Sequence, residues 1–178
     1  MVYRPSSPTN VIETERLRLR EMSESDAPFM LELLNDPDFK HFIGDRGVRT
    51  LEDAARYIRD RFVESYRQHG FGLWLVEPKG GGAPAGMCGL LRRGEPVQGV
   101  EVGYAFLPQS RGKGYAYEAA AASALYAREV LGLTRLHAVV DPDNAASIRV
   151  LEKLGMRFER AVRLAGEEAD IKLFSAEL

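Results

Sequence analysis

The stretch from Val100 to Ala116 combines residue types that can bind a phosphate group. A predicted strand is followed by a loop that carries Gly112 and Gly114, and then by the start of an alanine-rich helix. Backbone N–H groups at a helix start have no intrahelical acceptor, and the helix dipole adds positive character there. Glycine allows close approach of the backbone to a ligand, and Arg111 and Lys113 add positive charge. The segment predicts an anion site, with an ordinary strand-to-helix turn as the alternative.

Other phosphate motifs do not fit this loop. The Gly-x-x-x-x-Gly-Lys-Ser/Thr spacing of a P-loop is absent, and no third glycine stands at the spacing of a dinucleotide motif. The strand before the loop contains one charged residue, Glu101. A buried carboxylate needs a partner or a function. Glu101 is therefore a candidate general base, and the alternatives are a structural carboxylate that binds a nearby loop or an exposed strand residue.

The chain up to position 70 is predicted to form one strand and two helices, which help to position the loop. Polar and apolar residues alternate over Thr14–Arg20, which predicts a strand with one buried face. Ser23 and Asp26 resemble a capping box for a first helix, which the segment 35–38 ends. Thr50 caps a second helix that runs to a glycine at position 70.

The second half alternates strands and helices. Strands are predicted at 71–76, 86–91, 100–107, 136–140, 157–164 and 169–174, and helices at about 115–131 and 144–155. Residues 1–10 are polar, contain prolines and show no period, so we expect a loose arm followed by one domain over 11–178. The order of elements favours one mixed sheet with helices on both faces.

Composition narrows the functional classes. The chain has 178 residues, a formal net charge of -2 and one cysteine, Cys88, which lies in an apolar run and is expected to be a buried hydrophobe rather than a nucleophile. The sequence contains no cluster of basic residues of the kind that binds nucleic acids, so nucleic-acid binding is not expected. No signal-peptide pattern or apolar run of ~18 residues is present, so we expect a cytoplasmic protein. No metal-ligand spacing appears, and His41 and His137 receive no role.

Two blocks of sequence resemble the GNAT acyltransferase superfamily. Gln109-x-x-Gly112-x-Gly114 matches its Gln/Arg-x-x-Gly-x-Gly/Ala signature, and the segment 144–156 resembles its Asn-x-x-Ser-x-x-x-x-Glu-Lys-x-Gly-Phe block, with Met156 in place of phenylalanine. Together with Thr14–Arg20, these blocks are similar to the branch that acetylates ribosomal-protein N-termini. The resemblance extends from Val11 to the C-terminus.

The resemblance implies an α/β (α+β) GNAT fold. A mixed, mostly antiparallel sheet of six to seven strands would splay to bind coenzyme A between about four helices. The loop backbone would bind the pyrophosphate, and the pantetheine arm would pair with the preceding strand, as a peptide does in β-augmentation. The implied coenzyme-binding residues are Val102, Gly103, Tyr104, Ala105, Phe106, Leu107, Gln109, Ser110, Arg111, Gly112, Lys113, Gly114, Tyr115, Ala116, Asn144 and Lys153.

Several of these residues have alternatives. Gly103 and Ala105 leave room for the pantetheine arm or accommodate a covering helix. Asn144 contacts the pantetheine, caps the helix that follows, or does both. Lys153 approaches the phosphates or is a solvated helix lysine. In the implied reaction Ser147 protonates the leaving thiolate, unless it only caps the helix start.

The implied reaction is a direct transfer of acetyl from acetyl-coenzyme A to an amine, without an acyl-enzyme. An α-amine with a pKa of about 8 is roughly one-tenth neutral at pH 7, so a general base such as Glu101 helps, through a water molecule. A backbone N–H near Val102 or Gly103 would polarise the thioester carbonyl.

The expected acceptor is a peptide N-terminal α-amine. The alternatives are a small amine (an amino acid, a polyamine or an antibiotic) and a module that binds acyl-coenzyme A without catalysis. By the family pattern the acceptor wall comes from 36–49 and from the hairpin at 165–170. There Glu167, Glu168 and Asp170 either attract a cationic amine or form a solvated tip. A homodimer is possible, because dimers are common in this branch.

Overall fold

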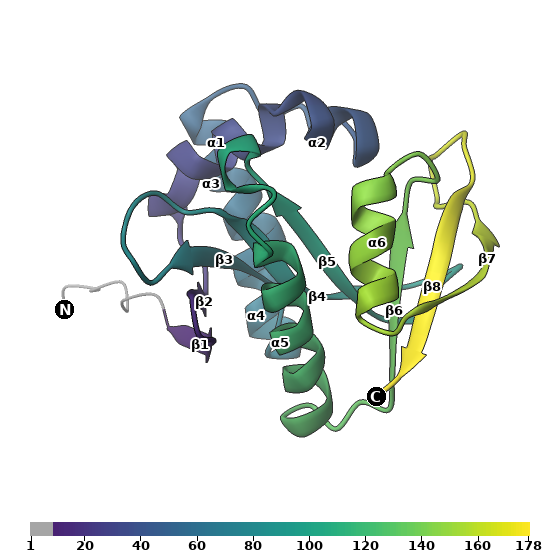
Figure 1. The fold of residues 1–178 in the computed structure, drawn as a ribbon. Helices are drawn as coiled ribbons and strands as arrows, with labels where there is room; N and C mark the ends of the chain where they lie inside the picture. The colour runs from purple at the N-terminus through teal and green to yellow at the C-terminus, as the bar shows by residue number, and fades with distance from the viewer. Residues whose placement is uncertain (1–8) are drawn as a thin grey trace.

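One eight-stranded sheet organises the molecule (Figure 1), and the computed structural model describes residues 9–178. The strand order is β1-β2-β3-β4-β5-β6-β8-β7. Every neighbouring pair is antiparallel except β5 and β6. The strands are β1 (Asn10–Glu13), β2 (Leu17–Arg20), β3 (Leu73–Pro78), β4 (Gly86–Arg93), β5 (Gly99–Phe106), β6 (Arg135–Val140), β7 (Arg157–Val162) and β8 (Ile171–Glu177). The mixed, mostly antiparallel sheet is confirmed.

The first strands differ from the prediction. The alternating segment Thr14–Arg20 was expected to be one strand, but the chain turns at its start and pairs β1 with β2 in a hairpin. The N–H of Thr14 donates to the carbonyl of Leu17 at 2.9 Å, which closes this turn. The additional strand β1 makes eight strands rather than six or seven. Of the arm expected at residues 1–10, residues 1–8 lie outside the described residues.

The helices follow the predicted caps with two differences. They are α1 (Ala27–Asn35), α2 (Pro37–Phe42), α3 (Leu51–Tyr57), α4 (Glu64–His69), α5 (Tyr115–Glu129) and α6 (Ala145–Lys153), with short turns η1 (Glu24–Asp26) and η3 (Pro108–Ser110). The second predicted helix continues from α3 to α4 through a π-helical segment, η2 (Ile58–Val63). Helix α2 differs from the sequence prediction, in which the segment 35–38 ends the first helix and no further helix follows before Thr50. In the structure the Asp36 carboxylate accepts from the N–H of Phe39 at 3.1 Å and begins a new helix.

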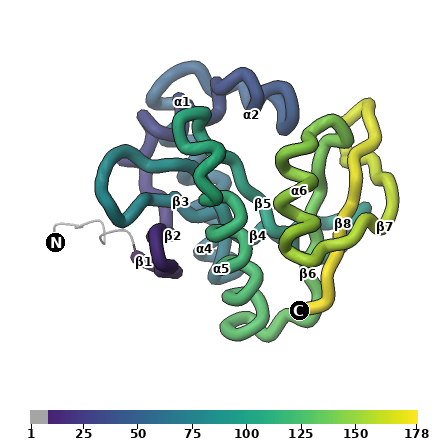
Figure 2. The backbone as a smooth tube through the Cα atoms, in the orientation of Figure 1, coloured from purple at the N-terminus to yellow at the C-terminus, as the bar shows by residue number. Residues whose placement is uncertain are grey.

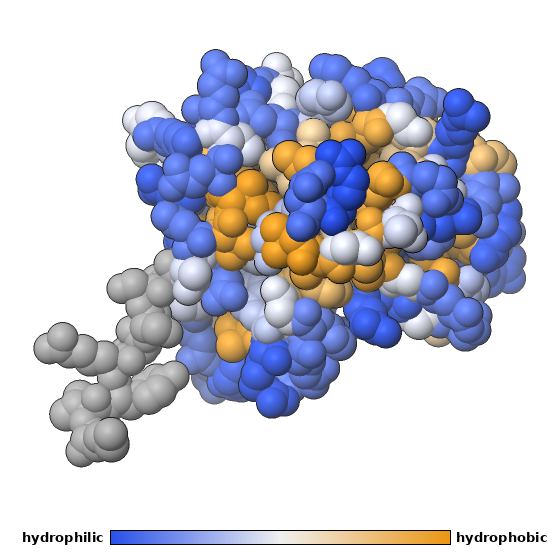
Figure 3. All heavy atoms as spheres, turned by 90° about the horizontal axis from the view of Figure 1, so that it is seen from below, coloured by the Kyte–Doolittle hydropathy of each residue, from blue (hydrophilic) through white to orange (hydrophobic). Residues whose placement is uncertain are grey.

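The sheet has a large hydrophobic core on each face, and a third, small cluster contains Val97, Val162 and Leu173. Figure 2 shows the path of the backbone around the sheet. Consecutive residues of β3 alternate between the two large cores, since side chains of a strand point to opposite faces. Leu73 and Leu75 pack with the helices α1 to α4, whereas Trp74 and Val76 pack toward α5. Figure 3 shows the lower face, where hydrophobic side chains gather between hydrophilic ones. Within residues 9–178, no helix has the length and apolar character needed to cross a membrane.

The sheet is splayed between β5 and β6, as expected. These two parallel strands pair at one position, Glu101 with His137. Beyond Glu101 the strands diverge toward α6 (Figure 1). The edge of β5 from Val102 to Ala105 is therefore free to pair with a ligand, whereas the carbonyl of Phe106 accepts from Arg111 Nε at 3.0 Å.

Candidate active site

The predicted phosphate loop borders a cavity of about 450 Å³. The cavity is lined by the second half of β5, the loop, the first turn of α5, α6, and residues of α1 and α2. Gly112 and Gly114 have φ angles of 72° and 80°, which favour glycine, and a Cβ at Gly112 would meet nothing within 4 Å. The first N–H groups of α5 have no intrahelical acceptor. These features fit a diphosphate at the loop.

A clamp from the β1–β2 turn holds this loop in place. Arg16 donates through Nη1 to the carbonyl of Lys113 at 2.8 Å. The Glu118 carboxylate accepts from the Thr14 hydroxyl at 2.6 Å, from the Arg16 N–H at 2.9 Å and from Arg16 Nε at 2.6 Å. Burial pushes the pKa of Glu118 up, but these hydrogen bonds outweigh it and the pKa lies below its ordinary value. The Thr14–Arg20 motif thus supports the loop through its turn.

Two of the predicted cations, Arg111 and Lys153, line the cavity. The Arg111 side chain pairs with Asp36 and Asp38, so two carboxylates compensate its charge. Lys153 lines the cavity, with Nζ 4.1 Å from the ring centroid of Tyr117. Arg149 lines it too, and we did not single it out from the sequence. Its position four residues before Lys153, on the same helix face, is the signal that indicates it.

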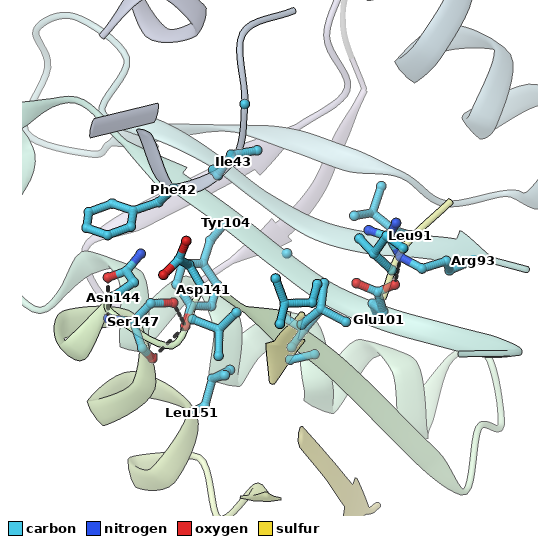
Figure 4. A pocket seen from close by; sticks show the side chains of 18 of the residues that line it. Phe42, Ile43, Leu91, Arg93, Glu101, Tyr104, Asp141, Asn144, Ser147 and Leu151 are labelled. Atoms are coloured by element: carbon cyan, nitrogen blue, oxygen red, sulfur yellow. Dashed lines mark hydrogen bonds and ion pairs between the residues drawn. The ribbon is translucent and has the colours of Figure 1, made fainter. Parts of the chain in front are cut away.

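A second cavity of about 460 Å³ adjoins the first (Figure 4). Both cavities are lined by Phe42, Ile43, Tyr104, Asn144 and Ser147, so they meet at these residues. We call this place the junction. Both segments expected for the acceptor wall contribute to the second cavity, with Lys40, His41 and Gly44 from one and Glu167 and Ala169 from the other.

Glu101 lies in the second cavity with its side chain 2% exposed. Its carboxylate pairs with Arg93 of the adjacent strand β4, so the buried carboxylate has a partner that the sequence did not indicate. Burial raises the pKa of Glu101, and Arg93 partly opposes this by favouring the charged form. In Figure 4 the Arg93–Glu101 pair lies apart from Asn144 and Ser147 at the junction.

Three side chains are hydrogen-bonded at the junction. Asn144 Oδ1 accepts from the Ser147 N–H at 3.1 Å, which confirms that Asn144 caps α6. The Ser147 hydroxyl donates to the Tyr104 hydroxyl oxygen at 3.0 Å, and the Tyr104 hydroxyl donates to the Ser147 carbonyl at 3.1 Å. Burial raises the pKa of Tyr104 to about 12, so the phenol stays neutral. The sequence had indicated Tyr104 only as a strand residue beside the pantetheine.

The remaining residues that were predicted to bind the coenzyme fall into two groups, those that line a cavity and those that do not. Those that line one or both cavities are Val102, Gly103, Ala105, Phe106, Ser110, Arg111, Gly112, Gly114, Tyr115, Ala116 and Lys153. Leu107 is 2% exposed and belongs to the core, Gln109 donates to Glu32 at 3.4 Å, and Lys113 is exposed on the loop. A Cβ at Gly103 would lie 3.0 Å from Leu91 Cδ1, so packing also requires a small residue there.

Two other side chains that could react, Cys88 and His137, line neither cavity. Cys88 is buried, burial raises the pKa of its thiol to about 12, and Sγ lies 3.6 Å from the Ser123 hydroxyl. Burial lowers the pKa of His137. Over residues 9–178, the His, Cys, Asp and Glu side chains form no cluster that could hold a metal ion.

Comparisons with known proteins agree with this geometry. Residues 16–157 match the acetyltransferase (GNAT) domain family. The uncharacterized protein YkkB of Bacillus subtilis is 35% identical over 153 residues, which cover 84% of this chain and 87% of YkkB. A GNAT-family acetyltransferase structure from Bacillus anthracis is 28% identical, with a TM-score of 0.76 and coverage of 93% and 97% of the two chains.

Two further solved structures share the fold. A RimL ribosomal L7/L12 alpha-N-protein acetyltransferase in complex with coenzyme A has a TM-score of 0.79 at 18% identity, covering 96% of this chain and 98% of its own. A spermidine N-acetyltransferase from Vibrio cholerae, in complex with coenzyme A and spermine, has a TM-score of 0.75 at 17% identity, covering 92% and 96%.

The splayed sheet and the glycine loop beside it define an acetyltransferase. The chain belongs to the GNAT family and is an N-acetyltransferase; enzymes of this family use acetyl-coenzyme A.

Proposed function

We propose that this N-acetyltransferase transfers acetyl directly from acetyl-coenzyme A to a peptide N-terminal α-amine. The observation that carries the proposal is the junction, where a cavity beside a phosphate-type loop meets a second cavity that holds a buried carboxylate. A thioester at the junction and an amine in the second cavity would lie close to one another. Bringing two reactants together in this way is a large part of catalysis.

The chain's own residues have distinct parts in the proposed reaction. Glu101 accepts the amine proton through a water molecule, which leaves the nitrogen lone pair free to attack the carbonyl carbon. Backbone N–H groups on the free edge of β5, near Val102 or Gly103, stabilise the oxyanion that forms. The carbon–sulfur bond then breaks and Ser147 supplies a proton to the thiolate. The attacking nitrogen, which still carries one proton more than an amide, returns a proton to Ser147 through water, so the serine hydroxyl is regenerated. No activated nucleophile lines the described part of the junction, which supports a direct transfer.

The charges of the second cavity favour a single amine over a polyamine. The carboxylates Glu101, Asp141 and Glu167 line it together with the cations Lys40 and Arg93, and Arg93 already pairs with Glu101. A polycation gains most from a strongly negative field, and a cavity with one carboxylate in excess does not supply one. A peptide terminus carries one ammonium group followed by neutral amide groups, which suits the lining better.

A small cationic amine is the second candidate acceptor. Asp141 and Glu167 line the cavity and have no ion-pair partner among residues 9–178, so they can attract an ammonium group. Glu101, in contrast, already pairs with Arg93. The two candidates differ in whether the acceptor needs a peptide bond after its amine.

The first experiment tests the coenzyme site by calorimetric titration of acetyl-coenzyme A. We compare the wild type with the double variant Gly112→Asp, Gly114→Asp, because the two carboxylates would oppose the phosphates. Both positions have a positive φ, which strains any side chain, so circular dichroism first establishes that the variant is folded. Tight binding by the wild type that the variant loses would support the coenzyme site. If the wild type does not bind acetyl-coenzyme A, the proposal is wrong.

The second experiment identifies the acceptor by measuring release of free coenzyme A thiol. The acceptors are short peptides with N-terminal Ala or Ser, the same peptides with a blocked N-terminus, spermidine and free amino acids. Turnover of only the unblocked peptides supports the peptide α-amine. Turnover of spermidine or free amino acids alone would favour the small-amine alternative, and binding without any turnover would favour a non-catalytic module.

A further inference from the structure

We propose that Arg111, although it belongs to the coenzyme loop, is a positioning residue for the acceptor-side wall. Its guanidinium holds helix α2, which leads into Phe42 and Ile43 at the junction. The inference rests on the proposed function, because it takes the two cavities as the coenzyme and acceptor sites. It assigns a role in acceptor binding to a residue whose position in the signature loop suggests phosphate binding.

Each nitrogen of the Arg111 guanidinium has a partner in the protein. Nη2 lies 2.7 Å from Asp36 Oδ2, and Nη1 lies 2.5 Å from Asp38 Oδ2. Nε donates to the carbonyl of Phe106 at 3.0 Å, at the end of β5. The side chain therefore joins β5, the loop and the start of α2. We call these contacts the Arg111 strap.

The strap reaches the first turn of α2 through a buried carboxylate. The side chain of Asp36 is 6% exposed, and a carboxylate at that depth needs a cation or several hydrogen bonds. The same oxygen, Oδ2, accepts from Arg111 and from the N–H of Phe39. Loss of Arg111 would leave this charge without its cation at the cap of the helix.

Helix α2 depends on such a contact. It has six residues, and a helix of that length is not stable on its own in water. Phe39 anchors it in the core, and the strap fixes its other side. The helix supplies Asp38 and Phe39 to the coenzyme cavity, and its end supplies Lys40 and His41 to the acceptor cavity and Phe42 and Ile43 to both. The position of α2 therefore sets the shape of the acceptor wall.

Coenzyme binding has other sources of positive charge. Arg149 and Lys153 of α6 line the coenzyme cavity, and the loop presents backbone N–H groups. Because the Arg111 charge is compensated by two carboxylates, its removal should affect α2 more than phosphate binding.

Two variants that break the strap from opposite ends test the proposal. Arg111→Met removes the cation, whereas the double variant Asp36→Asn, Asp38→Asn keeps Arg111 and preserves an N-cap oxygen at position 36. Hydrogen exchange of amides 37–43 reports on α2, and calorimetry with coenzyme A reports on the donor site. The KM for an acceptor from the thiol-release screen reports on the acceptor wall, and we expect it to rise without a comparable fall in kcat. Arg59→Met is the matched control, because Arg59 also pairs with two carboxylates, Glu24 and Asp60, on the exposed surface away from both cavities.

We expect both variants to speed exchange over 37–43 by about tenfold or more, with the dissociation constant of coenzyme A changed by less than about threefold. Arg59→Met should change neither quantity. If Arg111→Met weakens coenzyme A binding tenfold and leaves exchange unchanged, Arg111 binds phosphate and the proposal is overturned. Unchanged exchange in the Asp36, Asp38 variant overturns it too. A wild type that does not bind coenzyme A contradicts the proposed function, while the exchange comparison still tests the strap.

Discussion

Tyr104 and Ser147 exchange two hydrogen bonds at the junction of the two cavities. The Ser147 hydroxyl donates to the phenol oxygen at 3.0 Å, and the phenol donates to the Ser147 carbonyl at 3.1 Å. Because burial raises the pKa of Tyr104 to about 12, the phenol keeps its proton and acts as a hydrogen-bonding group. Tyr104 thereby holds the Ser147 side chain in one orientation, while the proton that Ser147 would give to a leaving thiolate points toward the phenol.

If Ser147 donates a proton to the leaving group and Tyr104 orients it, their effects will not be additive. We expect Ser147→Ala to lower kcat by about 100-fold and Tyr104→Phe by about tenfold, with the KM for acetyl-coenzyme A nearly unchanged. The double variant should match Ser147→Ala alone. Steady-state kinetics of the four proteins, with an acceptor from the thiol-release screen, measures this.

Tyr66→Phe is the control for the loss of a buried phenol. Tyr66 donates to the carbonyl of Leu73 and accepts from the N–H of Met22 at 3.2 Å, and it lines neither cavity. Its removal should cost about 1 kcal/mol of stability without a change in kcat. A double variant tenfold slower than Ser147→Ala would show that Tyr104 acts independently.

The pH dependence of the reaction should depend on Arg93. Glu101 must be ionised to accept a proton, so activity should fall as the pH falls through its pKa, which burial raises. Arg93 opposes that rise, so Arg93→Met should move the acidic limb of the kcat profile to higher pH. Glu101→Gln should remove this limb and lower kcat by about 100-fold.

The same shift has a consequence for stability. Because the pKa of Glu101 is raised in the folded protein, the protonated carboxyl contributes to the free energy of unfolding. That contribution is present at low pH and is lost as the pH rises through the folded-state pKa. Arg93→Met should therefore destabilise the protein more at pH 8 than at pH 5 in urea unfolding. Arg92→Met, an exposed neighbour on β4, is the control, and equal profiles for both variants would contradict the role of Arg93.

The Arg16–Glu118 clamp should influence coenzyme affinity. Arg16→Met removes the Nη1 bond to the Lys113 carbonyl and the Nε bond to Glu118, which loosens the loop without touching a ligand. The backbone N–H of Arg16 persists, so the loss is partial, and we expect the dissociation constant of coenzyme A to rise about threefold to tenfold in calorimetry.

Arg18→Met is the comparison for Arg16→Met, because Arg18 lies on the same hairpin and pairs with Glu13. It should leave coenzyme A binding unchanged. If Arg16→Met also binds coenzyme A with wild-type affinity, the loop does not need the clamp.

The features predicted from the sequence were mainly those that depend on neighbours in the chain. Thr50 with Asp53 forms the expected capping box, and Gly70 ends the same helical segment with a φ of 75°. The strand–loop–helix order around Gly112 is also local. Helix α2 was missed because Asp-Pro can end one helix or begin the next, and only the tertiary contact of Asp36 with Arg111 distinguishes the two.

The partners of the site residues were not readable, because they are distant in the chain or depend on strand register. Glu101 was recognised as a charge in a strand, but its pairing with Arg93 depends on how β4 aligns with β5. Tyr104 and Ser147 are 43 residues apart, and their contact requires α6 to lie over β5. Packing between elements sets these distances, and no short pattern encodes it.

The one paired position between β5 and β6 gives the molecule a pivot. Two strands that are paired at one position and diverge from it move least at that position and most at the ends that are farthest from it. Because β4 pairs with β5 along its whole length, a widening of the slot to admit a bulky donor would displace β6 and α6 rather than β5, and would leave Glu101, which is half of that pair, nearly stationary. The carboxylate that would receive the proton therefore lies where the two strands are joined, and its position changes least when the slot widens.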